Sequence, residues 1–190
     1  MAESSLDRLS RIREIEVVWK SYELRPETGL NISPEREAAY KRKVDANWPN
    51  VQEMARGYGL EFGPRNRNVR SRLALEGAKF AEDAGLASPY ARAMFHAHFT
   101  DGRDIGDTET LVDIARVSGL DGEAFRVCLE QRTMRERVNR ELALAAMYRL
   151  SGVPAFIVGG KYLVVGAQPL EMLVDVVDKA VKWSRGQLVA

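Results

Sequence analysis

The stretch that decides the fold is Gly152-Val153-Pro154-Ala155-Phe156-Ile157-Val158. Its second half is short, apolar and rich in β-branched and aromatic residues, which is typical of a buried strand. Proline directly before a strand is unusual because it cannot donate to a ladder, and it suits a cis peptide bond where the chain turns sharply into an edge. Val153 would then keep its amide and carbonyl for an extended peptide. A plain strand-initiating proline explains the same residues, so the stretch alone leaves both interpretations open.

The residues after this strand predict a β-hairpin and a closing helix. Gly159-Gly160 supplies a two-residue turn, and residues 161–165 are expected to form the second strand. Pro169 leads into the helix. The apolar residues expected to face inward from it are Leu170, Leu173, Val174, Val177 and Val181.

The N-terminal residues predict one helix and one strand. Leu6, Leu9 and Ile12 recur at a spacing close to the helical period. Residues 15–22 are instead rich in alternating β-branched and aromatic residues, so we expect a strand there. The segment Arg25-Pro26-Glu27-Thr28-Gly29 is expected to end it as a loop.

A helical block is expected in the middle of the chain. Ser33-Pro34-Glu35 is a helix start, with a capping hydroxyl, a proline at the first position and an acid in the first turn. Because Pro49 disfavours helical geometry at Trp48, we expect this helix to end near Asn47 and a new one to run to Arg56. Further helices are expected over residues 69–84, 88–98, 108–118, 122–130 and 133–151.

The order of these elements predicts the fold class. Strands near both ends of a helical block indicate an α/β layer with a large helical insertion between its halves. We expect residues 1–32 and 152–190 to form the layer and residues 33–151 to form the insertion.

The composition excludes several kinds of function. The 190 residues include 28 Lys and Arg against 27 Asp and Glu, so the net charge of +1 offers no global field for nucleic acid or an anionic membrane. Cys128 is the single cysteine, which excludes an internal disulfide, a Cys-x-x-Cys pair and a thiolate zinc cage. It lies in an apolar helical stretch, so we expect a small buried residue.

The sequence also gives no indication of a metal site, a secretory signal or a membrane span. His96 and His98 are the only histidines, and their spacing puts them on different helix faces, so no metal site is expected. No signal sequence and no run long enough to span a membrane is present, and we expect a cytoplasmic protein.

The longer stretch from Gly152 to Pro169, GVPAFIVGGKYLVVGAQP, closely resembles the C-terminal half of the DsbA-like thioredoxin-fold family. The similarity is to the branch with FrnE-type oxidoreductases and 2-hydroxychromene-2-carboxylate isomerases. Residues 19–26 (WKSYELRP) look like the family's second strand and its exit. Residues 71–81 (SRLALEGAKFA) and 99–106 (FTDGRDIG) look like its helical insertion. The resemblance runs over residues 6–182.

The resemblance implies a thioredoxin-like fold and a thiol–disulfide oxidoreductase without a cofactor. The loop at Val153 and Pro154 would bind the substrate, a protein or a small molecule with a thiol or disulfide. Members of the family carry a strand and a Cys-x-x-Cys at the start of the first helix, where the helix terminus lowers a thiol pKa. This sequence begins inside what resembles that helix and has no counterpart of the first core strand or the motif. Its catalytic residues are therefore unknown, and we expect the chain as given to be inactive.

Two other functions fit the same resemblance. A glutathione-dependent isomerase or transferase would dock glutathione on the loop at Val153 and Pro154. A non-catalytic peptide-binding or assembly module would keep the docking edge without thiol chemistry. The missing strand would reflect a start placed too late or a natural loss, and in the second case a homodimer or direct pairing of the remaining strands would fill the gap.

Overall fold

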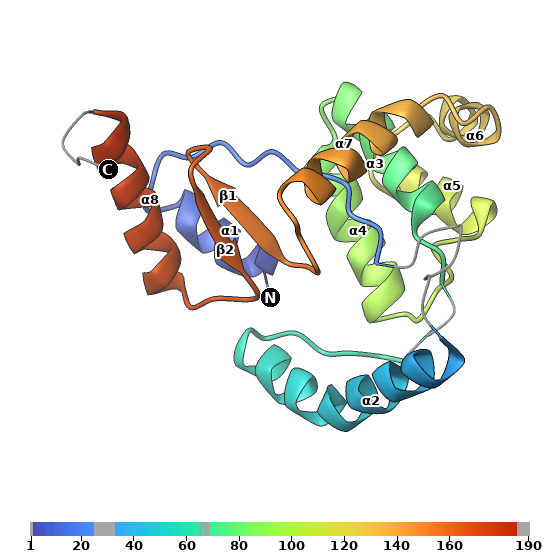
Figure 1. Ribbon diagram of the computed structural model, residues 1–190. Coiled ribbons are helices and arrows are strands. Elements are labelled where there is room, and N and C mark those ends of the chain that lie inside the picture. Colours follow the sequence, from blue (N-terminus) through green and yellow to red (C-terminus); the bar gives the residue numbers. More distant parts are fainter. Residues whose placement is uncertain (1, 25–32, 65, 67–68, 186–190) are drawn as a thin grey trace. The chain divides into compact units, whose positions relative to one another are not determined.

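The computed structural model describes residues 2–24, 33–64, 66 and 69–185 (Figure 1). Its elements are, in chain order, α1 (Ala2–Ser10), α2 (Pro34–Gly57), α3 (Arg72–Asp83), α4 (Ala87–Phe99), α5 (Thr108–Val117), α6 (Gly122–Glu130), α7 (Arg135–Met147), β1 (Ala155–Val158), β2 (Tyr162–Val165) and α8 (Leu170–Ser184). Chain contacts divide them into two compact units. We call Met1–Lys20 with Ala146–Ala190 the sheet unit and Ser21–Ala145 the helical unit. The domain boundaries expected at residues 33 and 151 stay a prediction.

The sheet unit is built on the hairpin that the sequence predicts. β1 and β2 pair antiparallel, with Phe156 opposite Val164 and Ile157 opposite Leu163. Helices α1 and α8 cover one face, where Leu9 of α1 and Leu173 of α8 pack with Val164 (Figure 1). Alternation along a strand sends successive side chains to opposite faces, so the hairpin places Phe156 and Val164 in this core.

An ion pair holds the end of α1 to α8. The guanidinium of Arg13 donates to both carboxylate oxygens of Asp178, at 2.7 and 2.9 Å. Both side chains are partly exposed, so this pair adds less to stability than the apolar core does. Val181, expected to face inward, is instead 39% exposed, whereas its neighbour Ala180 is buried, so Ala180 occupies the inward position at this turn of α8.

The strand expected over residues 15–22 is not present. This segment has no ladder and no regular structure, and the sheet of the described chain consists of β1 and β2. Ile15 packs into the sheet unit's core, whereas Val17 and Val18 are exposed. Strand propensity reflects how well side chains fit a sheet surface, and here no neighbouring strand supplies one.

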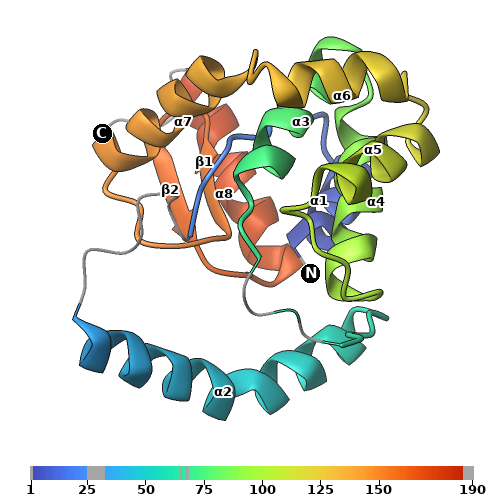
Figure 2. The ribbon, with the colours of Figure 1, turned by 90° about the vertical axis from the view of Figure 1, so that its right-hand side faces the viewer.

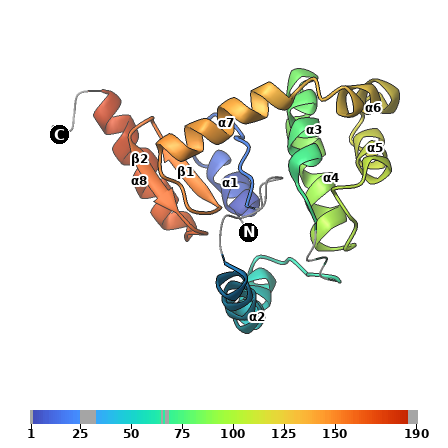
Figure 3. The same ribbon diagram turned by 45° about the vertical axis from the view of Figure 1, so that its right-hand side comes forward.

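The helical unit packs around α3, which contacts α4, α5 and α6 (Figure 3). Phe125 of α6 contacts Phe80 and Tyr90, each with ring centroids 5.6 Å apart. Gly77 of α3 allows this approach, because a Cβ atom there would lie 2.5 Å from the Phe125 ring and 2.6 Å from the Tyr90 hydroxyl. Such distances are far inside van der Waals contact, so only glycine fits.

Helix α2 differs from its prediction, because it continues through Pro49 as one helix (Figure 2). Proline removes one helical hydrogen bond and crowds the preceding turn. At this same turn the ring of Trp48 contacts that of Phe62, with centroids 4.8 Å apart. The preference of Trp48 for a non-helical conformation before proline is therefore overridden here, at a residue that also makes a tertiary contact.

The helical unit also buries charged side chains, a feature that no sequence pattern above predicted. We call Glu23, Arg72, Glu76, Lys79 and Glu141, together with the partly exposed Arg132 that pairs with Glu76, the buried charge cluster. Glu76 on α3 is fully buried. Arg132 donates to both of its carboxylate oxygens at 2.8 Å, and Arg72 donates to it at 3.1 Å. Arg132 reaches it from a left-handed backbone (φ 55°) between α6 and α7.

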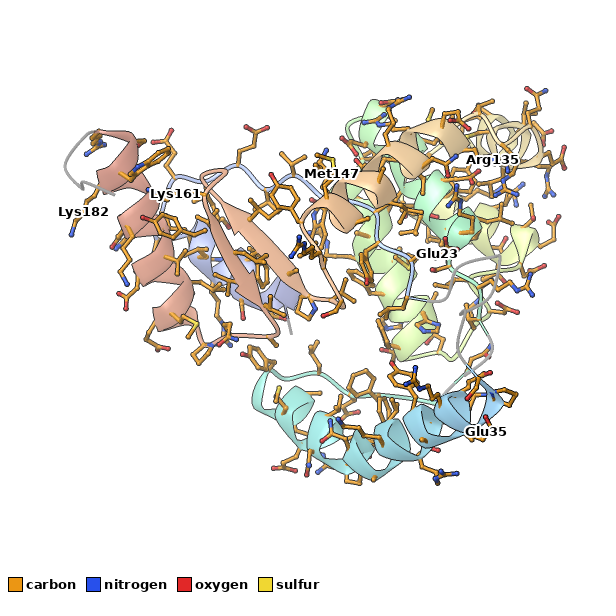
Figure 4. All side chains as sticks on the ribbon, in the orientation of Figure 1. Glu23, Glu35, Arg135, Met147, Lys161 and Lys182 are labelled. Carbon is orange, nitrogen blue, oxygen red and sulfur yellow. The ribbon has the colours of Figure 1, made fainter. Side chains whose placement is uncertain are left out.

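Two further contacts complete this cluster, one to the N-terminal segment and one to α7. Arg72 also pairs with Glu23, at 3.4 Å, and Figure 4 shows Glu23 beside the ribbon of α3. Lys79 pairs with Glu141 of α7 at 3.0 Å. Each of these charges thus contacts an opposite charge, and this pairing offsets part of the desolvation free energy that burial costs.

Substituting Glu76→Gln should strongly destabilise the protein. The change leaves Arg72 and Arg132 without their buried carboxylate, so the free energy of unfolding should fall by ~3 kcal/mol or more. Urea unfolding followed by circular dichroism measures it. Glu130→Gln on the exposed end of α6 is the control and should change the value by less than ~0.5 kcal/mol. An equal effect of both substitutions would contradict the assigned role of Glu76.

Lowering the pH should remove the contribution of the Glu76 carboxylate to the free energy of unfolding. Burial raises the pKa of this carboxyl, but hydrogen bonds from Arg132 and Arg72 outweigh burial and bring the pKa below its ordinary value. A carboxyl with a lowered folded pKa stabilises fully above its unfolded pKa, and the effect is lost as pH falls through the folded pKa. The difference in unfolding free energy between wild type and Glu76→Gln should therefore narrow as pH falls from 7 to about 3. Urea titrations across that range measure it, and a constant difference would refute the prediction.

Candidate functional site

The candidate site is the loop that enters β1, which we call the proline loop (residues 152–154). The peptide bond between Val153 and Pro154 is cis. The Pro154 carbonyl accepts a hydrogen bond of 2.8 Å from the Gly166 amide, which follows β2. The loop is therefore fastened to the hairpin at the open ends of both strands.

Val153 is the most accessible part of this loop. The residue is 51% exposed, and no hydrogen bond joins its amide or carbonyl to another residue of the described chain. A backbone held in fixed geometry with unpaired, solvated groups can take an extended peptide by main-chain hydrogen bonds. This arrangement can bind a polypeptide segment without any charged side chain.

The hairpin continues this surface. Within the described residues β1 pairs with β2 alone, so the other edge of β1 has no strand beside it. On the hairpin face away from α1 and α8, Ile157, Leu163 and Val165 are 39%, 47% and 54% exposed. The site therefore combines a strand edge with an apolar face, and both suit an extended, partly apolar ligand.

The exposed apolar face of the hairpin was not predicted from the sequence. A signal for it was present, since both strands are apolar at successive positions instead of alternating with polar residues. Such runs are typical of strands that are covered on both faces. Interpreting them as two-sided would have predicted a second apolar surface on the hairpin.

Cys128 does not belong to the proline loop. It lies on α6 in the helical unit and is buried, as predicted. Burial raises the pKa of its thiol, against a smaller lowering by the Thr133 hydroxyl, which donates to the sulfur at 3.1 Å. A buried thiol with a raised pKa is a poor nucleophile at neutral pH.

The histidines are not arranged as metal ligands. His96 pairs with Asp101 at 3.2 Å on an exposed surface, and burial lowers the pKa of His98. Among the residues that the structure describes, no cluster of three or more His, Cys, Asp or Glu could hold a metal ion. In the same part of the chain, no helix is both long and apolar enough to cross a membrane.

Comparison with known sequences gives three matches. The sequence model described as "DSBA-like thioredoxin domain" matches residues 1–178. The uncharacterized protein YwbO of Bacillus subtilis (strain 168) is 32% identical over 152 residues, which cover 77% of this chain and 74% of that protein. The thiol:disulfide interchange protein DsbA of Azotobacter vinelandii is 28% identical over 81 residues, which cover 43% of this chain and 38% of that protein.

Two solved structures share the fold. A probable DsbA oxidoreductase from Streptomyces coelicolor has a TM-score of 0.83 and 25% identity, covering 100% of this chain and 85% of that one. A 2-hydroxychromene-2-carboxylate isomerase has a TM-score of 0.76 and 22% identity, covering 99% and 92%. The predicted α/β fold of thioredoxin-like type with a helical insertion is confirmed, and so is the resemblance to the DsbA-like family, while the likeness to the isomerase is one of fold.

Alanine substitutions at the two glycines of the hairpin turn should lower the free energy of unfolding by different amounts. Both have left-handed backbones, with φ of 59° at Gly159 and 68° at Gly160. A Cβ atom at Gly159 would lie 3.0 Å from the Cβ of Ala180 in α8, whereas one at Gly160 would meet nothing within 4 Å. Gly160→Ala should cost about 1 kcal/mol of unfolding free energy from backbone strain alone. Gly159→Ala should cost about 2 kcal/mol because crowding adds to the strain.

Urea unfolding of the two variants under one set of conditions measures this difference. An equal loss in both would mean that the hairpin does not pack on α8 at Gly159.

Proposed function

Because this chain belongs to the family of DSBA-like thioredoxin domains, we propose that it takes part in thiol–disulfide exchange as the part that binds the substrate. Its ligand is an extended polypeptide segment, next to a disulfide or thiol, that pairs with Val153 and the free edge of β1. The observation that carries this proposal is that Val153 of the proline loop is exposed and that its backbone amide and carbonyl are unpaired within the described chain.

The chemistry of exchange needs a second partner in this proposal. In disulfide exchange a thiolate attacks one sulfur of a disulfide, a mixed disulfide forms, and the other sulfur leaves as a thiolate. The 190 residues contain Cys128 alone, and its buried thiol does not suit attack. We therefore propose that these residues bind substrate but do not turn it over by themselves, so that no residue of the chain is assigned as catalytic.

A glutathione-dependent isomerase is the second candidate. The observation that favours it is the fold shared with 2-hydroxychromene-2-carboxylate isomerase, at a TM-score of 0.76. Glutathione is itself a short extended peptide with a thiol, so the same backbone of Val153 would accept it. A non-catalytic assembly module would use this surface for a partner protein. The FrnE-type assignment, the cytoplasmic location and the homodimer remain predictions from the sequence.

Binding should be visible at Val153 by nuclear magnetic resonance. Titration with an extended apolar peptide containing a methylated cysteine should shift the amide signals of Val153 and Ile157 but leave Leu111, in the helical core, unchanged. Val153→Pro removes the amide donor and should weaken binding by about tenfold, the effect of one hydrogen bond. Val153→Ala keeps the backbone groups and should weaken it by less than about threefold.

The same titration with reduced glutathione separates the candidates. Shifts with the peptide but not glutathione support the oxidoreductase or assembly role, and shifts with glutathione alone support the isomerase. An insulin-reduction assay on this chain should show no turnover above the uncatalysed rate. Turnover there, or no shift at Val153 with either ligand, would overturn the proposal.

A further inference from the structure

The chain crosses between its two units at two places. One crossing lies between Lys20 and Ser21 and the other between Ala145 and Ala146. The helical unit is thus inserted within the sequence of the sheet unit. An inserted unit is tolerated where its own first and last residues lie close together.

The helical unit joins its two ends by a direct hydrogen bond. The Ser21 amide, at the first residue of the unit, donates to Oε2 of Glu141 at 2.7 Å. Glu141 lies on α7, one helical turn before the last residue of the unit. Both residues are buried, so water does not compete freely for this bond.

Lys79 of α3 contacts the other oxygen of the same carboxylate. Its Nζ lies 3.0 Å from Oε1 of Glu141 and 2.7 Å from Oε2 of Glu82. The Lys79 side chain is only 2% exposed. Burial raises the pKa of Glu141, but the Ser21 amide and Lys79 outweigh it and lower that pKa, so the group stays charged at neutral pH. Hydrogen bonds to a charged acceptor are stronger than those between neutral groups.

We infer that Ser21, Lys79 and Glu141 form a clasp that fixes both ends of the helical unit to a single point on α3. One carboxylate oxygen of Glu141 accepts from the Ser21 amide, where the chain enters the helical unit, and the other contacts Lys79 of α3. Glu141 itself lies on α7, through which the chain leaves the unit. The contact of Arg72 with Glu23 fastens the incoming segment a second time, two residues further on.

The clasp accounts for order in a segment without secondary structure. Residues 21–24 form no ladder, yet Ser21 and Glu23 are buried. Motion in either connection therefore stops at the clasp and does not spread into the core around α3. This inference concerns the helical unit alone and does not depend on the proposed function.

Amide hydrogen exchange of the full chain at neutral pH tests the clasp. In the wild type the Ser21 amide should exchange at least ~100-fold more slowly than in an open chain, although it belongs to no helix or strand. Glu141→Gln should speed exchange at Ser21 at least tenfold, while the Leu111 amide in α5 changes by less than about threefold. Glu136→Gln, an exposed residue of the same helix, is the matched control and should leave both rates unchanged.

A second variant keeps the test decisive if Glu141→Gln fails to fold. Lys79→Gln should also speed exchange at Ser21, and the double variant should exceed the larger single effect by less than about twofold, because one interaction is lost in all three. Exchange of Ser21 at the open-chain rate in the wild type would overturn the inference. So would equal acceleration at Ser21 and Leu111, which would mean a general loss of stability, or an equal effect of Glu136→Gln.

Discussion

The helical unit depends on the carboxylate of Glu76, which is fully buried between Arg72 and Arg132. An unpaired charge in this place would cost several kcal/mol, about as much as the whole stability of many domains. Both guanidinium groups must therefore be present, and each comes from a different place in the chain. Arg72 belongs to α3, whereas Arg132 adopts a left-handed backbone after α6. This one group thus requires α3 and the junction between α6 and α7 to pack together.

The sheet unit also depends on apolar burial, but its core contains no buried charge like Glu76 among the residues described. Its hairpin has one face on α1 and α8, where Val164 and Leu173 are buried, and one face on which Ile157, Leu163 and Val165 are exposed. The proline loop lies at the end of this hairpin. Both units therefore have an apolar core, but only the helical unit adds paired, buried charges that fix the position of its elements, and only the hairpin leaves an apolar face exposed among the residues described.

Helices and turns that depend on a few neighbouring residues were predicted well. The hairpin with its Gly159-Gly160 turn is confirmed, and the helices from α3 to α8 begin and end within a few residues of the expected positions. Predictions that needed a partner were wrong. Residues 15–22 have strand-like composition but no neighbouring strand, and Pro49 stays within a helix where Trp48 contacts Phe62. The sequence named Val153 and Pro154 as a candidate binding loop, which stays a prediction, whereas the exposure and unpaired backbone of Val153 could be seen only in the structure.

The sequence by itself determined the fold class, because helical periodicity, turn glycines and the proline before β1 act over a few residues each. It also identified the family through four stretches in a fixed order, and Cys128 as a small buried residue. Only the tertiary structure decided which charges are buried and which apolar side chains stay exposed. Glu76 and Glu130 are both glutamates on helices, yet one is fully buried and the other is exposed. The burial of a side chain and the pairing of a charge depend on residues far apart in the chain, and a local sequence pattern does not show which of these residues meet.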